Sequence, residues 1–545
     1  MEMANPQYFR RSFIKSLIAG SALAALDWNA FPRGAQSRTR NEDYDAVVIG
    51  SGLGGLSCAA AFARQGFRPL VLEQHSKPGG YATTFRRRDY IFDVSLHSTV
   101  VGERQGRYDL IHGFPEITEV EFVPHPDLYR AVYPGHDLRV PQRDIEGYIK
   151  QLAVLFPEEE EGVKGLFADM EDFSSEISRV SRAGAETDMS RFALDYPMLA
   201  RFGRSSWGAM ADARIKNPQL SAIVSSLWVY FGLPPSRLSS LYYLLPTLSY
   251  LRHGGCYAVG RSQKISDALV RFIEQRGGEV RCRTRVERIL LKESAAAGVV
   301  TGDGEQIPAR VVISNANPHD TFSRMMDEPG LTQEILGRMD ELGISLSSFQ
   351  VFLGLNRDLI GDLGIKDTEI FYYPDYDHDV NYSAMAAADL ERGGYALTLY
   401  DNVYDGYSPA GKNTLNLLTL QGYDFWERYA ADYFRNERTA YKKQKEEMAD
   451  RLIDDAEKRF LPGLRAAIEV REVGTPLTNI RYTSNTRGAI YGWDQTLDNS
   501  GQNRFPHATP VANLYLAGAW TRPGHGYGAV IPSGLLCFAE IMKTW

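Results

Sequence analysis

A glycine-rich segment near residue 50 constrains the fold of this chain more than any other feature. Residues 44–49 are apolar and β-branched, which is typical of a buried parallel strand. The next six residues are Gly50, Ser51, Gly52, Leu53, Gly54 and Gly55. An alanine-rich helical stretch follows from Leu56 to Gln65, and a second strand from Phe67 to Leu72 ends in Glu73. This order of strand, glycine turn, helix and acid predicts an α/β unit that binds a dinucleotide.

Each residue type in this unit has a physical role. Gly50 allows a tight turn, Gly52 lets the backbone approach a pyrophosphate, and Gly55 lets helix and strand pack closely. The free N–H groups and partial positive charge of the helix N-terminus favour phosphate. Glu73 can accept hydrogen bonds from ribose hydroxyls, and its charge disfavours a 2′-phosphate. The alternative is a glycine-rich turn in an unrelated α/β unit.

Two further glycine motifs lie far apart in the sequence. The pair Gly79-Gly80 follows soon after the acid. Near the other end, a strand over residues 514–517 runs into a glycine-rich loop, and a helix is expected to begin near Ile531. Such a loop directs free amides at an anionic or electron-rich ligand.

Together these motifs resemble the phytoene desaturase family, whose relatives include carotenoid isomerases and retinol saturases. The resemblance also covers residues 254–260 and the loop Ser314–Pro318. It implies FAD as the cofactor. The implied fold class is α/β: an FAD-binding Rossmann-like domain of the glutathione-reductase-like, amine-oxidase-like type with an inserted mixed α+β substrate domain.

The resemblance assigns FAD contacts residue by residue. The residues that it implies are Gly50, Ser51, Gly52, Leu53, Gly54, Gly55, Glu73, Gln74, Gly79, Gly80, Tyr81, Val286, Gly518, Ala519, Gly528, Ala529 and Val530. Ala519 stands where many flavoproteins carry an acid, which favours the desaturase branch over the amine oxidases. Asp93-Val94-Ser95 departs from the usual Asp-x-Gly of the family, so the local backbone is expected to differ.

The domain organisation follows from where the motifs lie. We expect a discontinuous FAD-binding domain from residues 44–104, 250–330 and 475–545. Residues 105–249 and 331–474 carry no usable motif and are assigned to the substrate-binding domain.

A reaction at a carbon–carbon bond needs a group that manages a proton. His97, His525 and Tyr527 are the catalytic candidates, because their motifs are expected on the flavin side. Each of them could instead be a packed residue, and an apolar pocket alone could suffice. The tyrosine-rich segment 370–407 is expected either to line a pocket for a conjugated ligand or to cover a sheet.

The first 35 residues have the layout of a cleaved signal. Arg10 and Arg11 precede a short apolar run that is too short to span a bilayer. The segment resembles a twin-arginine export signal, which predicts a periplasmic or otherwise exported protein. Cleavage after Ala22-Leu23-Ala24 and cleavage near Ala35 are both open. A chance arginine pair before an amphipathic helix is the alternative.

Composition limits the partners. The net charge of −8 over 545 residues speaks against a nucleic-acid binder. The four cysteines form no C-x-x-C, so no metal site is expected. A second G-x-G-x-x-G is not found, so we expect electrons to pass between flavin and quinone, dioxygen or a redox protein. After the leader, no segment is apolar and long enough to span a bilayer, and peripheral membrane contact stays open.

These observations predict an exported FAD-dependent oxidoreductase that desaturates, saturates or isomerises a hydrophobic, polyene or isoprenoid substrate. A flavin amine or alcohol oxidase of the same superfold is the enzymatic alternative. A non-redox carrier resembling the prenyl-binding GDP-dissociation inhibitors is the third possibility, and the intact pyrophosphate glycines argue against it.

Overall fold

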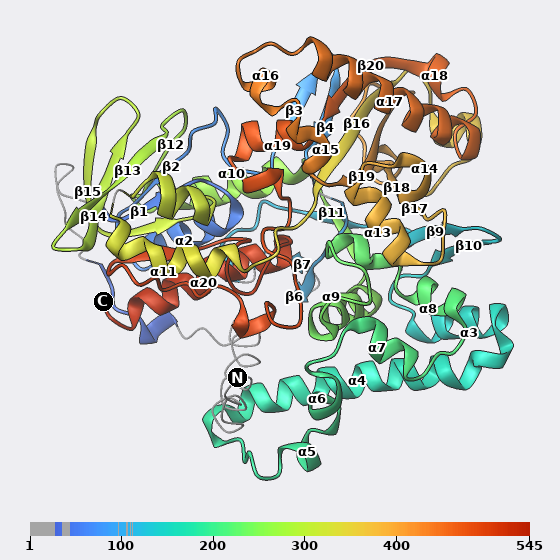
Figure 1. Ribbon diagram of the computed structural model, residues 1–545, viewed down its shortest axis with the longest axis horizontal. Coiled ribbons are helices and arrows are strands. Elements are labelled where there is room, and N and C mark those ends of the chain that lie inside the picture. Colours follow the sequence, from blue (N-terminus) through green and yellow to red (C-terminus); the bar gives the residue numbers. More distant parts are fainter. Residues whose placement is uncertain are drawn as a thin grey trace.

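Two seven-stranded sheets organise the protein (Figure 1). The computed structural model describes residues 28–34, 44–95, 97–104, 107–109, 111, 113–326 and 328–545. The predicted twin-arginine motif at Arg10 and Arg11 lies outside the described residues.

The first sheet has the order β12-β2-β1-β15-β14-β13, with β21 on β15. Its strands are β1 (Tyr44–Ile49), β2 (Pro69–Leu72), β12 (Glu279–Arg281), β13 (Val286–Lys292), β14 (Ala295–Thr301), β15 (Gln306–Ser314) and β21 (Leu514–Leu516). β1 is parallel to β2 and β15, and β21 is parallel to β15. One sheet therefore draws strands from the N-terminal, middle and C-terminal parts of the chain.

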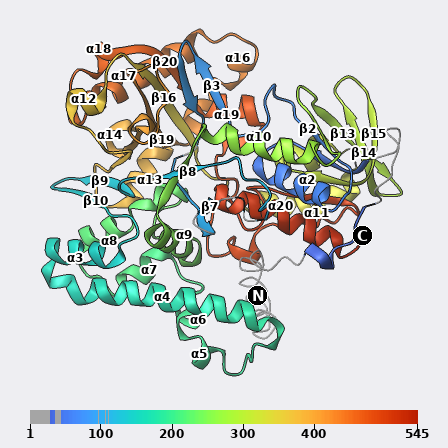
Figure 2. The same ribbon diagram turned by 180° about the vertical axis from the view of Figure 1, so that it is seen from behind.

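Both faces of this sheet are covered, which explains the continuous apolar run of β1. Ala46 and Val48 pack in the same core cluster as residues of α2 (Leu53–Arg64), α10 (Arg261–Glu274) and α20 (Tyr527–Met542). Val47 and Ile49 pack on the opposite face with residues of β13 and β14. α2 and α20 lie side by side, as both views show (Figure 1, Figure 2).

The glycine turns shift two helix starts from the predicted positions. α2 begins at Leu53 and α20 at Tyr527, whereas the sequence predicted Leu56 and the neighbourhood of Ile531. Both helices have a glycine at the N-cap, Gly52 and Gly526. The first turn of a helix has no intrahelical partners for its N–H groups, so weak helix formers are tolerated there.

The second sheet has the order β10-β9-β17-β18-β19-β16-β20. Its strands are β9 (Tyr129–Tyr133), β10 (His136–Val140), β16 (Ser347–Leu355), β17 (Glu369–Tyr372), β18 (Tyr395–Thr398), β19 (Asn413–Gln421) and β20 (Ile468–Gly474). One face packs on α17 (Thr439–Arg459), and the other packs on a helical layer with α4 (Glu160–Ala183) and α9 (Ser240–His253). Ile370 points to the first face and Phe371 to the second.

Smaller sheets and further helices complete the fold. The small strands are β3 (Thr84–Arg87), β4 (Tyr90–Asp93), β5 (Thr99–Val100), β6 (Gly102–Arg104), β7 (Arg107–Asp109), β8 (Phe122–Pro124) and β11 (Gly255–Ala258). The other helices of at least five residues are α3 (Ile145–Leu155), α6 (Pro197–Phe202), α7 (Trp207–Asp212), α8 (Pro218–Val224), η5 (Ser226–Tyr230), η6 (Asp320–Arg324), α11 (Pro329–Asp340), α12 (Leu359–Leu363), α13 (His378–Ala386), α16 (Ala430–Phe434) and α19 (Pro476–Thr483). The shorter ones are η2 (Trp28–Ala30), η3 (Pro157–Glu159), η4 (Gly184–Glu186), α5 (Phe192–Asp195), α14 (Leu390–Gly393), η7 (Tyr400–Asn402), α15 (Asp424–Glu427), α18 (Leu464–Ala467), η8 (Thr486–Gly488) and η9 (Gly501–Asn503). Within the described ranges, no helix has the length and hydropathy of a membrane span.

The last part of the predicted leader packs against the helices that cover one face of the first sheet. The ring of Trp28 lies 6.0 Å from that of Phe538, and Phe31 lies 5.3 Å from the same ring. Gln65 donates a hydrogen bond to the Trp28 carbonyl at 2.9 Å. Residues 28–34 therefore belong to the packed structure, unlike the expectation that the first 35 residues lie outside the fold.

Candidate FAD site and adjoining cavity

The turn after β1 is shaped by glycines that have no room for a side chain. Gly50 has φ = +91°, a left-handed conformation that favours glycine. A Cβ atom at Gly55 would lie 2.4 Å from the Gly50 carbonyl oxygen, and one at Gly54 would lie 2.6 Å from the Cα of Gly518. The N-terminal and C-terminal glycine motifs therefore meet at van der Waals distance.

Asn315 lies between the two motifs. A Cβ atom on Gly52 would lie 2.6 Å from its Nδ2, and one on Gly518 would lie 2.4 Å from its Oδ1. Asn315 belongs to the Ser314–Pro318 loop after β15, so the middle of the chain contributes to the same junction. The sequence analysis noted this loop without assigning Asn315 a role.

Glu73 is buried, and its carboxylate fixes the glycine turn after β1 through hydrogen bonds. Its Oε2 accepts hydrogen bonds from the Ser51 amide at 2.9 Å and from the Ser51 hydroxyl at 2.6 Å. Its Oε1 accepts one from the His75 amide at 2.8 Å. A carboxylate has about four lone-pair sites, so acceptor capacity remains for a ribose. Gln74 instead lies at the surface, where its amide is 3.4 Å from the Ser484 hydroxyl.

The second glycine pair lies against the first turn. The Gly79 amide donates to the Ser51 carbonyl at 3.0 Å, and a Cβ atom on Gly80 would lie 3.3 Å from the Cα of Gly52. The next residue, Tyr81, has a buried hydroxyl near Thr483 that makes no hydrogen bond. Burial raises the pKa of this phenol, which therefore stays neutral.

Val286 is the first residue of β13 and is buried. The connection that leads to it runs beside the acid: the Thr284 amide donates to the Glu73 carbonyl at 2.8 Å, and the Arg283 amide donates to the His75 carbonyl at 2.9 Å. The predicted FAD contact at Val286 and the predicted ribose contact at Glu73 are thus on neighbouring segments.

The C-terminal loop brings a second helix N-terminus to the site. Gly518 follows β21 with φ = +97°, and its amide donates to the Ser533 hydroxyl of α20 at 3.0 Å. Gly528, Ala529 and Val530 form the first turn of α20, which has no side-chain cap. The Ser57 hydroxyl of α2 donates to the Ile531 carbonyl at 2.8 Å, which holds the two helices together.

These residues fit an FAD. The uncapped N-termini of α2 and α20 both present free amides and a positive dipole end. The packing of Gly52, Gly54 and Gly518 against Asn315 and against one another leaves no space for side chains, so the two glycine motifs lie backbone to backbone beside both helix N-termini.

A buried arginine, Arg504, supports the C-terminal loop. It is fully buried and donates to the carbonyls of Ala519 at 2.6 Å, Trp493 at 3.0 Å and Thr521 at 3.1 Å. Burial lowers its pKa to about 10, so the guanidinium stays charged at neutral pH. Sequence reasoning missed Arg504, because it lies in a stretch with no motif.

The structure brings two of the three catalytic candidates to one residue, Tyr230. The Nε2 of His525 lies 3.1 Å from the Tyr230 carbonyl, and the ring of His97 lies 6.0 Å from the Tyr230 ring. Tyr527 lies elsewhere: its hydroxyl is 3.4 Å from the Tyr81 carbonyl, beside a cluster with Tyr257.

The environments of these candidates differ. Burial, together with the charge of Arg504, lowers the pKa of His525 to about 3. His525 is therefore neutral, and its Nε2 carries the hydrogen because the Tyr230 carbonyl can only accept. Burial also raises the pKa of Tyr527, which stays a neutral phenol.

His97 and Tyr230 line a cavity of about 30 Å³ next to the second sheet. The other lining residues are Val229, Phe371, Tyr372, Tyr373, Met385, Tyr395, Ala396, Leu418, Thr419, Leu420 and Tyr491. Aromatic and apolar side chains dominate. Tyr372 and Tyr395 belong to the sheet, as one of the two expectations for the tyrosine-rich segment had it, and they also line the cavity; that the cavity takes a conjugated ligand stays a prediction.

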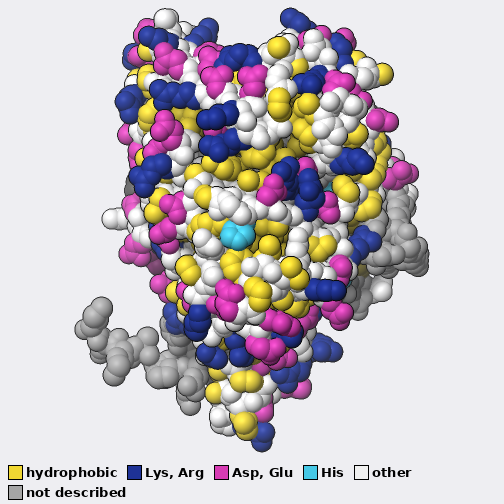
Figure 3. Space-filling model, turned by 90° about the vertical axis from the view of Figure 1, so that its right-hand side faces the viewer, with side chains coloured by type: hydrophobic (Ala, Val, Ile, Leu, Met, Phe, Trp, Pro, Cys, Tyr) yellow, Lys and Arg dark blue, Asp and Glu magenta, His cyan; other side chains and the backbone are white. Residues whose placement is uncertain are grey.

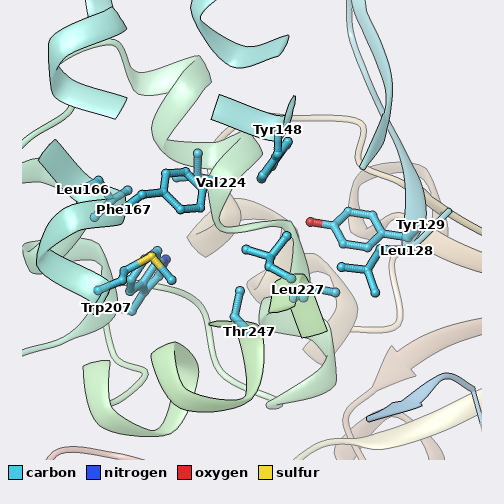
Figure 4. A pocket seen from close by; sticks show the side chains of 11 residues that line it. Leu128, Tyr129, Tyr148, Leu166, Phe167, Trp207, Val224, Leu227 and Thr247 are labelled. Carbon is cyan, nitrogen blue, oxygen red and sulfur yellow. The ribbon is translucent and has the colours of Figure 1, made fainter. Parts of the chain in front are cut away.

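A second cavity lies inside the helical layer, away from the glycine motifs (Figure 4). It measures about 10 Å³ and is lined by side chains such as Phe167, Trp207 and Leu227. A single water needs roughly 10–15 Å³, so this is core packing and not a ligand site. Among the described residues, no group of His, Cys, Asp or Glu could hold a metal ion.

Charged side chains of both signs are interspersed with hydrophobic ones on the face shown in Figure 3. No broad basic surface is visible on this face. This distribution agrees with the acidic net charge of the chain.

Comparisons with known proteins agree with this geometry. The model of the family described as flavin containing amine oxidoreductase matches residues 53–537. Prolycopene isomerase 1, chloroplastic, from an Oncidium hybrid cultivar is 27% identical over 91% of this chain and 83% of its own length. All-trans-retinol 13,14-reductase from Danio rerio is 28% identical over 92% of this chain and 86% of its own length.

A solved structure supports the fold. Putrescine oxidase bound to putrescine superposes with a TM-score of 0.60 at 16% identity, over 92% of this chain and 99% of that chain. The predicted fold class and the predicted resemblance are both confirmed.

Proposed function

Because the chain belongs to the flavin containing amine oxidoreductase family, we propose that it acts on carbon–carbon bonds of a hydrophobic polyene or isoprenoid molecule. The chain is an FAD-dependent oxidoreductase, as the sequence predicted, and is related to prolycopene isomerases and retinol reductases. The alternative of a non-redox carrier does not agree with this membership. The reaction is a desaturation, a saturation or an isomerisation.

The observation that carries the proposal is the lining of the cavity at Tyr230. Its walls are aromatic and aliphatic, which suits a conjugated hydrocarbon. The Tyr230 carbonyl is bound by His525, one residue before the N-cap of α20, so the cavity adjoins the C-terminal glycine loop. A cavity of about 30 Å³ is far smaller than a polyene, so lining side chains must move for substrate to enter.

The chain supplies binding and orientation, and FAD supplies the two-electron chemistry when bound. We assign the pyrophosphate to the amides that open α2, the adenosine ribose to Glu73 and the adenine end to Val286. The flavin is assigned to Gly518, Ala519 and the first turn of α20. Arg504 holds this loop in place through the Ala519 carbonyl.

An amine oxidase of the same superfold would need a substrate-polarising cage beside the flavin. Here the ring of His525 packs against Tyr491 at 4.4 Å and against Tyr242 at 5.3 Å. The two tyrosines beside the loop are therefore engaged by a histidine ring. This packing favours the polyene substrate over an amine.

Anaerobic mixing tests the proposal. The oxidised protein, and separately the dithionite-reduced protein, is mixed with polyenes and with amines, and the flavin absorbance near ~450 nm is followed. We expect a polyene to change the absorbance of one of the two forms if it is desaturated or saturated, or to be recovered as a geometric isomer if it is isomerised, while amines change neither form. Bleaching by amines alone would contradict the proposal.

The electron partner and the membrane contact are part of the proposal. We propose a quinone, dioxygen or a redox protein as the electron partner, because the sequence holds a single dinucleotide-binding glycine motif. A quinone or a polyene partitions into membranes, so peripheral membrane contact would bring the protein to both. Steady-state reoxidation of the reduced flavin by each acceptor class distinguishes them.

We also propose that the protein is exported and cleaved after Ala24. Trp28 and Phe31 pack against the core, so cleavage near Ala35 would remove a packed segment. The Ala22-Leu23-Ala24 site leaves this segment in place. The intact mass of protein recovered from the periplasmic fraction tests this: a mature chain that begins at Ala25 is expected, and one that begins after Ala35, or retention in the cytoplasm, would contradict it.

A further inference from the structure

A buried carboxylate stands directly behind the cavity. Glu369 opens β17 and is 1% exposed. Its Oε2 accepts a hydrogen bond from the Tyr230 hydroxyl at 2.5 Å, and its Oε1 lies 3.1 Å from the Nδ1 of His97. The latter pair lacks hydrogen-bond geometry, so Oε1 has no hydrogen-bond donor among the residues that the structure describes. Both partners of Glu369 line the cavity.

The other groups around Glu369 do not neutralise it. His125 is fully buried, and burial lowers its pKa to about 4, so this ring is neutral. The tyrosines whose pKa Glu369 raises, in addition to the effect of burial, are Tyr230, Tyr250, Tyr373, Tyr400 and Tyr491. Across the described ranges, the basic side chain within 4 Å of Glu369 is His97 alone. A buried carboxylate needs a compensating partner, and His97 is placed to be that partner.

We propose that Glu369 is a positioning residue that holds His97 protonated against the cavity, and that His97 delivers this proton to the substrate. The proposal rests on the proposed function and deepens it. Tyr230 fixes the carboxylate through the 2.5 Å hydrogen bond, and Glu369 in turn orients the imidazole.

The proton transfer can be written for a saturation and for an isomerisation of the substrate. In a saturation, the N–H bond of the His97 imidazolium breaks and a C–H bond forms with the π-electron pair of the substrate. The adjacent carbon would then need a hydride, and a bound, reduced FAD would be the two-electron donor that supplies it. In an isomerisation, the same C–H bond breaks after rotation about the former double bond, and the proton returns to His97. Glu369 stays anionic throughout.

The first test is a titration that needs no substrate. Holoprotein labelled with ¹⁵N-histidine is titrated by NMR, with the His97→Gln variant identifying the His97 signals. We expect the ¹⁵N chemical shifts of the His97 ring nitrogens to move toward those of a neutral imidazole in Glu369→Gln, because the ring loses its charged partner. Glu369→Asp should give intermediate shifts. Unchanged His97 ring shifts in both variants would overturn the proposal.

The second test is the rate of the chemical step against pH, with a polyene that reacts with the wild type. Glu369→Gln should slow the step about 100-fold and move the protonation-dependent limb to lower pH, and Glu369→Asp should recover part of the rate. The matched control is Glu472→Gln on β20, which removes a surface ion pair with Arg87 and should leave rate and pH profile unchanged. Equal profiles for Glu369→Gln and wild type would overturn the proposal. If no polyene reacts with the wild type, the proposed function fails, while the titration still decides the pairing of Glu369 with His97.

Discussion

Two buried carboxyl groups, Asp93 and Glu369, differ in how completely they are satisfied. Asp93 is 7% exposed and Glu369 is 1% exposed. Asp93 accepts hydrogen bonds from the Ser262 amide and hydroxyl and from the hydroxyls of Tyr257 and Tyr407. Glu369 accepts one hydrogen bond, from Tyr230, and its second oxygen faces His97 without one.

The difference separates a structural group from a functional one. The donors to Asp93 come from β11, α10 and the loop after η7, so this carboxyl ties the β3–β4 hairpin to its neighbours. One oxygen of Glu369 lacks a hydrogen-bond donor among the described residues and faces His97, which agrees with the proposed pairing of the two side chains. The family departure at Asp93-Val94-Ser95 therefore leaves a well-satisfied aspartate in place.

The largest expected effect is on stability when Asp93 is removed. Asp93→Ala should lower the free energy of unfolding by about 3 kcal/mol, because the Ser262 and tyrosine donors lose their acceptor. Glu369→Gln should cost less than about 1 kcal/mol, because the amide oxygen can still accept from Tyr230 while a buried charge is removed. Urea unfolding of both holoproteins at pH 6 measures this. Equal losses would erase the distinction between the two carboxyls.

The pH dependence of stability gives a second contrast. Burial raises the pKa of Asp93 to about 7 in the folded state, against about 3.9 in the unfolded chain. The folded state therefore binds more protons between these values, and stability falls as pH rises. Between pH 5 and pH 7, the free energy of unfolding of the wild type should fall by about 2 kcal/mol more than that of Asp93→Asn. A constant difference between the two proteins over this window would show that Asp93 is ionised throughout.

The smallest expected effects come from removing one hydroxyl at each carboxyl. Tyr257→Phe should cost about 1 kcal/mol of stability and leave the rate unchanged, because Ser262 still donates to Asp93. Tyr230→Phe should slow the chemical step about tenfold, since Glu369 loses its one hydrogen bond. Urea unfolding and single-turnover kinetics of both variants measure these effects. A slower chemical step in Tyr257→Phe but not in Tyr230→Phe would contradict the roles assigned to Asp93 and Glu369.

The FAD-binding fold could be predicted because its signals are local. The strand over Tyr44–Ile49, the glycine turn and the acid at Glu73 all lie within 30 residues. Each of these features has its own physical role in binding a dinucleotide. The two helix starts were predicted late, because glycines at Gly526 and Gly528 look like a loop although they cap and open α20.

The cavity could not be predicted because its residues meet only in the tertiary structure. His97, Tyr230 and Glu369 come from three separate segments; the sequence marked His97 as a candidate, but Tyr230 and Glu369 have no motif around them. One signal for Glu369 was present: an acid opens the strand Glu-Ile-Phe-Tyr, whose other residues are apolar or aromatic. Arg504 gave no signal, since its partners are backbone carbonyls of a loop formed by distant residues.

A structure of the yellow holoprotein tests the central claim most directly, namely that both ends of the chain bind one flavin that adjoins the Glu369 cavity. We predict the pyrophosphate at the N-terminus of α2, the flavin ring against Gly518 and Ala519, and His97 across one continuous cavity from that ring. A flavin bound away from the Gly54–Gly518 junction, or a ring separated from His97 by packed protein, would contradict it.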